Sequence, residues 1–139
     1  MSVGTFGPTT ALHDGTMNTQ VGYGNSVPTI STQGDPAAVT DAATLTAAQV
    51  GTGLLVLTSA GGDTYTLPTV ALWETYLGGA DNIPVNTSFD FFIVSLSGTS
   101  TLAIGTGWTI VGHDTMATVS GHWRARKTAA SAWTAYRLA

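Results

Sequence analysis

Few side chains in this sequence could perform acid–base or metal chemistry. Its 139 residues contain three histidines and eight acidic residues, and no cysteine. His13, His113 and His122 are far apart, although His113 is followed directly by an acid, and neighbours on a strand point to opposite faces. Metal sites in proteins usually pair ligands at short helical or strand spacings. Most of the acids fall in predicted turns, where local hydrogen bonds favour them. We therefore expect no catalytic site, no metal and no cofactor.

Positive charge is concentrated near the C-terminus. Three of the four Lys and Arg residues lie in GHWRARKT (121–128), and the fourth is Arg137. As a strand, this segment alternates, with His122, Arg124 and Arg126 on one face and Trp123, Ala125 and Lys127 on the other. A hairpin through residues 128–131 would let Arg137 extend the row of cations. Its possible roles are to meet carboxylates across a subunit or partner boundary, to bind nucleic acid, or to form a solvated strand face.

The net charge of −4 disfavours nucleic-acid binding, because such proteins usually carry Lys and Arg over a wider surface. We expect His122, Arg124, Arg126 and Arg137 to provide electrostatic contacts at a protein interface. No nucleic-acid partner is expected.

The four tryptophans allow two interpretations. Trp73 is expected to pack under a short helix, while Trp108, Trp123 and Trp133 come from late predicted strands. The three late tryptophans are expected to fill one apolar face of the core. The alternative is a stacking platform for a glycan.

The elements that must position these residues are mainly strands. Charged residues make up 9% of the chain, against about 25% in an ordinary soluble domain, and Thr, Ser and Gly are abundant. Short apolar runs separated by Gly, Ser and Asp turns recur after residue 41, at 53–59, 64–67, 88–97 and in several later segments. In SFDFFIVSLS (88–97) both faces carry apolar residues, so we expect a central strand that is covered on both sides.

Two short helical segments are also predicted. DAATLTAAQV (41–50) is rich in alanine and is expected to form one helical turn. PTVALWETYLGG (68–79) combines Pro68 at the start with Gly78 at the end, and its Val70, Trp73 and Leu77 have helical spacing. The predicted fold is all-β, a jelly-roll-like sandwich or small barrel over residues 41–139.

Residues 1–40 have a different composition, with many Gly and Pro and isolated apolar residues. A flexible tail is one interpretation. We favour an extended arm that contacts a neighbouring protein through Phe6, Leu12, Tyr23 and Ile30. No signal peptide is recognisable and no apolar run is long enough for a membrane span, so we expect synthesis in the cytoplasm and no membrane partner. The low charge favours oligomerisation or docking on a larger assembly.

The order of motifs after residue 45 resembles that of small trimeric β-proteins of bacteriophage heads, which decorate or cement capsids. The matching segments are LTAAQ, an apolar strand with a Gly turn, LPT before a helix, a Phe-rich strand, GTGWT, and TMA before a basic strand. The resemblance implies a virion structural protein without catalytic activity. It further implies a homotrimer on the capsid surface whose arm contacts the major capsid protein. The alternative is a receptor- or glycan-binding domain of a head or tail fibre.

Overall fold

Two units make up the chain in the computed structural model, which describes residues 19–20, 29–30 and 32–139. The units are Met1–Gly34 and Asp35–Ala139. In the first, β1 (Thr19–Gln20) pairs antiparallel with β2 (Thr29–Ile30). The second holds all the other described elements, mostly strands in mixed sheets, and confirms the predicted β-rich fold.

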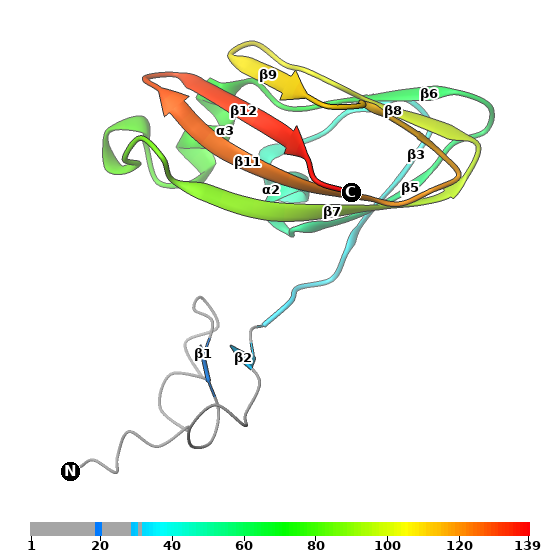
Figure 1. Ribbon diagram of the computed structural model, residues 1–139, viewed down its shortest axis with the longest axis horizontal. Coiled ribbons are helices and arrows are strands. Elements are labelled where there is room, and N and C mark those ends of the chain that lie inside the picture. The colour runs from blue at the N-terminus through cyan, green and yellow to red at the C-terminus, as the bar shows by residue number, and fades with distance from the viewer. Residues whose placement is uncertain (1–18, 21–28, 31) are drawn as a thin grey trace. The chain divides into compact units, whose positions relative to one another are not determined.

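A six-stranded sheet forms the larger part of the second unit (Figure 1). In spatial order its strands are β3 (Ala37–Thr40), β5 (Leu54–Thr58), β7 (Ser88–Ser97), β11 (Gly121–Ala129), β12 (Ala132–Arg137) and β9 (Trp108–Val111). The pairs β3–β5, β5–β7 and β12–β9 are parallel, while β7–β11 and β11–β12 are antiparallel. The predicted domain boundary at residue 40 is therefore too late, because β3 already belongs to this sheet.

The second sheet has four strands. Their order is β10 (Thr115–Ala117), β8 (Thr99–Ala103), β6 (Asp63–Thr66) and β4 (Ala43–Thr44). β10 is antiparallel to β8, and the other two pairs are parallel. The sequence patterns located most of these strands but did not predict their parallel pairing.

One buried cluster contains residues from both sheets. The six-stranded sheet contributes Leu55, Phe91 and Trp123, and the four-stranded sheet contributes Tyr65 and Leu102, all with no exposed surface. Along β7 and β11 burial alternates with a period of two, as a sheet with one core-facing side requires. The predicted second cover over β7 is not found among the described residues, where Phe92 and Leu96 are 45% and 61% exposed.

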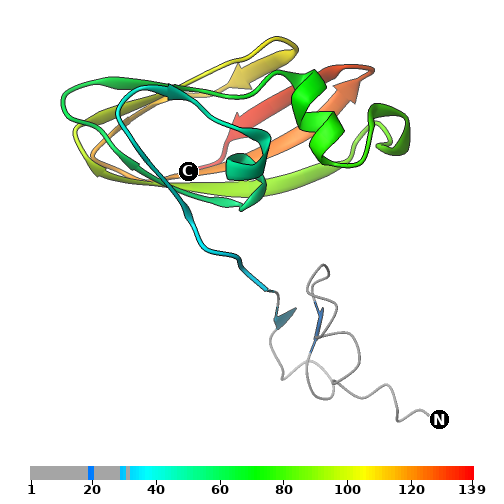
Figure 2. The same ribbon diagram turned by 180° about the vertical axis from the view of Figure 1, so that it is seen from behind.

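Two α-helices and one 3-10 turn accompany the described strands, and both helices were predicted. α2 (Ala47–Gly51) begins at a capping box in which Thr46 and Gln49 exchange hydrogen bonds. α3 (Val70–Tyr76) begins at Thr69 and is followed by the turn η2 (Ala80–Asn82). The two helices pack side by side (Figures 1 and 2).

The buried side of α3 differs from the prediction at one position. Val70 and Trp73 are buried as expected, but Leu77 is 39% exposed. Glu74 is buried instead, and it lies four residues after Val70 on the same helical face. A buried carboxylate requires a partner, and the partner is the lysine of the basic segment.

Candidate interaction face on the six-stranded sheet

The side of the six-stranded sheet that points away from the core carries His122, Arg124 and Arg126, three of the four predicted cations. On β7 and β11, Asp90 lies opposite Arg124 and Phe92 lies opposite His122. On β12, Tyr136 lies opposite Arg124. We call this side the outer face; it carries Leu54, Val56, Asp90, Phe92, Val94, Leu96, His122, Arg124, Arg126 and Tyr136.

Asp90 joins two of the cations. Arg124 Nε donates to Asp90 Oδ1 at 2.6 Å and Arg124 Nη2 donates to Oδ2 at 3.0 Å. His122 Nε2 lies 2.9 Å from Oδ2. The hydrogen bonds from Arg124 hold the pKa of Asp90 below its ordinary value, and the same carboxylate raises the pKa of Arg124. The fork geometry orients the guanidinium on the sheet surface.

Arg126 completes the row of cations. It donates from Nη1 to Asn86 Oδ1 and from Nη2 to the Tyr136 hydroxyl, the latter at 3.4 Å. The predicted grouping of His122, Arg124 and Arg126 on one face is thus confirmed. The carboxylate that His122 and Arg124 contact belongs to their own chain, so Arg124 has a counter-ion before any partner binds, whereas Arg126 donates to neutral groups.

Beside these polar groups lies an apolar surface. We call Leu54, Val56, Phe92, Val94 and Leu96 the apolar patch. The parallel register aligns Leu54 with Phe92 and Val56 with Val94. The ring of Phe92 also stacks on His122, with 4.3 Å between the ring centres, and so joins the patch to the polar cluster.

Arg137 does not extend the row, contrary to our expectation. The hairpin register places it opposite Trp123, on the core side of the sheet. Its guanidinium lies 5.2 Å from the centre of the Trp123 ring and donates to the carbonyls of His113, Thr115, Ser120 and Ala139. The alternation along β12 was predicted correctly. The register, which sequence alternation cannot supply, puts Thr134 and Tyr136 beside the cations instead.

The alternative interpretation of Trp108, Trp123 and Trp133 as a glycan platform does not agree with their burial. All three indoles are buried, with at most 4% of their surface exposed. Trp133 packs edge-on against Trp73 and beside Trp108, and Trp123 stacks on Phe91. A sugar needs an exposed aromatic face, so the core interpretation of these residues is confirmed.

Lys127 forms a buried ion pair that sequence reasoning missed. Its Nζ lies 2.7 Å from Glu74 Oε2, and both side chains are at most 4% exposed. The ammonium also donates to the carbonyls of Ala80 and Ile83, and Trp133 Nε1 donates to the same Glu74 oxygen. Two signals could have found this pair: Lys127 shares a strand face with Trp123, and Glu74 shares a helix face with Val70.

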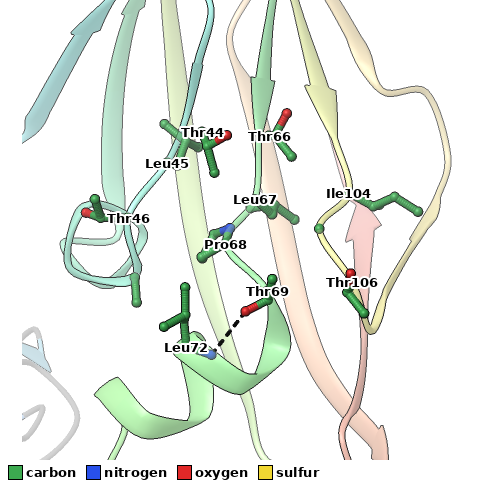
Figure 3. Close-up of a pocket in the computed structure, with 12 residues that line it drawn as sticks. Thr44, Leu45, Thr46, Thr66, Leu67, Pro68, Thr69, Leu72, Ile104 and Thr106 are labelled. Atoms are coloured by element: carbon green, nitrogen blue, oxygen red, sulfur yellow. Dashed lines mark hydrogen bonds between the residues drawn. The ribbon is translucent and has the colours of Figure 1, made fainter.

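A separate hollow opens between the start of α3 and the loop that follows β8 (Figure 3). It has a volume of about 540 Å³, and its lining is threonine and aliphatic, without a charged side chain. Leu72 and Ile104, 61% and 51% exposed, contribute to its walls. It can hold an apolar group, but it offers no general acid or base.

The remaining predictions concern metal sites, membrane-spanning segments and the contacts of the N-terminal arm. In the part of the chain that the structure describes, no group of three His, Cys, Asp or Glu side chains could hold a metal ion. Likewise, no described helix is long and apolar enough to cross a membrane. Of the predicted arm contacts, Phe6, Leu12 and Tyr23 lie outside the described residues, and Ile30 belongs to β2.

Comparison with known proteins identified no relative of this chain. No protein-family model matches the chain, and neither a curated protein nor a solved structure matches it.

Proposed function

We propose that this chain is a structural subunit of a bacteriophage virion that decorates and cements the outer surface of the capsid as a homotrimer. The observation that carries the proposal is the outer face, where a partly exposed apolar patch, with Phe92 and Leu96 the most exposed, adjoins polar groups that have hydrogen-bond partners within the chain. Exposed apolar surface bordered by polar residues is typical of protein–protein contact.

Two further features support a role in assembly. Only 9% of the residues are charged, which suits a subunit that buries much of its surface. The order of the LPT, GTGWT and TMA motifs resembles that of phage decoration proteins, and the structure brings two of these motifs into contact. Trp108 Nε1 of GTGWT donates to the carbonyl of Pro68 in LPT, at 2.8 Å.

The proposal includes a finer description of the fold and of the partner. We interpret the two sheets around their common buried cluster as a β-sandwich. The partner is the major capsid protein, and the segment before Asp35 is the arm that contacts it. Because this role requires only binding, the subunit performs no catalysis.

Co-sedimentation with assembled capsids tests this function. The chain is expected to pellet with particles at a fixed copy number per capsid, and to raise the temperature at which they release DNA. A chain that stays in the supernatant with every particle from its own phage would refute the decoration role.

A further inference from the structure

We infer that the outer face is the surface by which copies of this chain associate, with the apolar patch at the centre of the contact. The inference rests on the self-association in the proposed function, but not on capsid attachment. It assigns a specific face and specific residues to that association.

The strands β5 and β7 have apolar side chains on both faces, but only one of these faces is covered among the described residues. β3, β5 and β7 form a parallel part of a mixed sheet, and in all-parallel sheets both faces are almost always covered. β5 and β7 have the matching composition, since LLVL and FFIV place apolar side chains on both faces. Among the described residues only the core face is covered. β5 and β7 therefore have the composition of strands that are covered on both faces, and the cover of their outer face comes from outside the described fold.

The polar groups of the outer face favour a second copy of this chain as the occupant. The carboxylate of Asp90 already receives Arg124 and His122, and Arg126 donates to the neutral Asn86 and Tyr136, so these polar groups of the face have hydrogen-bond partners within the chain. The face suits a partner that is apolar at the centre and places no cation against Arg126. Copies of the same face have these properties when their apolar patches meet around a three-fold axis and Arg126 stays at the edge of the contact, and closed symmetric assembly from identical subunits is the commonest form of oligomer.

The area of the outer face is comparable to that of a standard protein–protein interface. The six strands lie about 4.8 Å apart and rise about 3.3 Å per residue, and their lengths run from four residues in β3 and β9 to ten in β7. Several hundred Å² of sheet surface, enlarged by side-chain relief, approach the roughly 800 Å² that each partner contributes to a standard interface. The outer face is thus large enough to hold copies together.

Thiol labelling of the full chain tests the inference sharply, because the sequence has no cysteine. Leu96→Cys places a single thiol in the apolar patch, and Ile104→Cys places a matched thiol at the hollow; both leucine and isoleucine are more than half exposed. After reduction and removal of the reductant, maleimide should label the thiol at position 104 rapidly at any protein concentration. At position 96 it should label slowly in concentrated solution and rapidly after dilution.

A second pair of variants measures the association itself. Val94→Lys with Leu96→Lys should weaken association roughly thirtyfold or more, as loss of interface hot spots does, measured by sedimentation velocity. Leu72→Lys with Ile104→Lys is the control and should leave association unchanged. Near-ultraviolet circular dichroism of the buried tryptophans verifies that both variants are folded.

Other outcomes overturn the inference in distinguishable ways. A wild-type chain that is monomeric at every concentration would remove self-association altogether, while capsid co-sedimentation would still be judged separately. Equal labelling at positions 96 and 104 in an oligomer would place the interface elsewhere. Protection of position 96 in the dilute monomer would mean that the chain's own N-terminal segment covers the patch. If position 96 is protected from maleimide only when capsids are present, the capsid protein is what covers the apolar patch.

Discussion

At the scale of single residues, the Lys127–Glu74 pair is the most consequential interaction in the described core. Two opposite charges are buried together, and each also has a neutral partner: the ammonium bonds to two carbonyls and the carboxylate to an indole. Burial of an ion pair contributes little net stability, because desolvation offsets the attraction. Removing one member leaves the other charge buried and unpaired, which is far more costly.

Lys127→Met is therefore expected to lower the free energy of unfolding by about 3–5 kcal/mol. Arg126→Met is the matched control on the same strand, and since Arg126 points to the outer face it should cost at most about 1 kcal/mol. Urea unfolding monitored by tryptophan fluorescence measures both. Adding Glu74→Gln to Lys127→Met should restore part of the loss, since Gln still accepts from Trp133. Equal effects of the two single variants would contradict the importance of the buried pair.

Asp90 makes stability depend on pH. Because Arg124 and His122 lower its folded pKa, the carboxylate contributes stability above its unfolded pKa, near the ordinary value of 3.8. That contribution is lost as the pH falls through the lowered folded value. Wild type should therefore lose more stability than Asp90→Asn between about pH 5 and pH 2. Thermal unfolding across this interval measures the difference, and parallel profiles would show that Asp90 is not involved.

At the scale of elements, the loop between β8 and β9 is held tightly against the start of α3. A Cβ on Gly105 would lie 2.4 Å from the Leu67 carbonyl oxygen, so only glycine fits there. Gly107 has a φ of +92°, and a Cβ there would lie 2.8 Å from the Val70 side chain. The GTGW segment is thus a packing motif that lets Trp108 reach the Pro68 carbonyl.

Gly107→Ala should destabilise the protein by about 2–3 kcal/mol, because it combines an unfavourable φ with a steric clash. Gly61→Ala is the control: its Cβ meets nothing within 4 Å, and the effect should stay within about 0.5 kcal/mol. Melting temperatures of the two variants provide the comparison. If the melting temperatures of the two variants fall equally, the loop is less constrained than its contacts indicate.

At the scale of the whole molecule, the described core lies entirely after Asp35. Every member of the buried cluster belongs to the second unit, including the residues from β3 onward. Folding of this unit and attachment to a capsid are therefore expected to be separable.

Deleting residues 1–34 should leave a folded chain that still associates with itself but no longer pellets with capsids. The reason is that the core and the outer face both lie in the retained unit, while the proposed capsid contacts do not. Circular dichroism tests whether the shortened chain folds, sedimentation velocity tests its self-association, and co-sedimentation with capsids tests its attachment. Retained capsid binding would show that the arm assignment is wrong, and loss of folding would show that the two units are interdependent.

Local patterns were sufficient for much of the secondary structure. The strands at β5, β6 and β7, the β11–β12 hairpin and both helices follow from alternation, turn residues and capping residues, all of which act over a few neighbouring positions. Burial of Trp73, Trp108, Trp123 and Trp133 follows from the apolar faces of their elements. The grouping of His122, Arg124 and Arg126 follows from the two-residue period of a strand.

The sequence by itself therefore determined the β-rich fold, its short helices and the sharing of one strand face by three cations. Only the tertiary structure decided which elements meet. It paired β7 in parallel with β5, turned Arg137 toward Trp123, and brought Glu74 to Lys127 across 53 positions of the chain. The physical reason is that periodicity assigns residues to a face but does not choose the neighbouring strand or its register, which depend on contacts between distant segments.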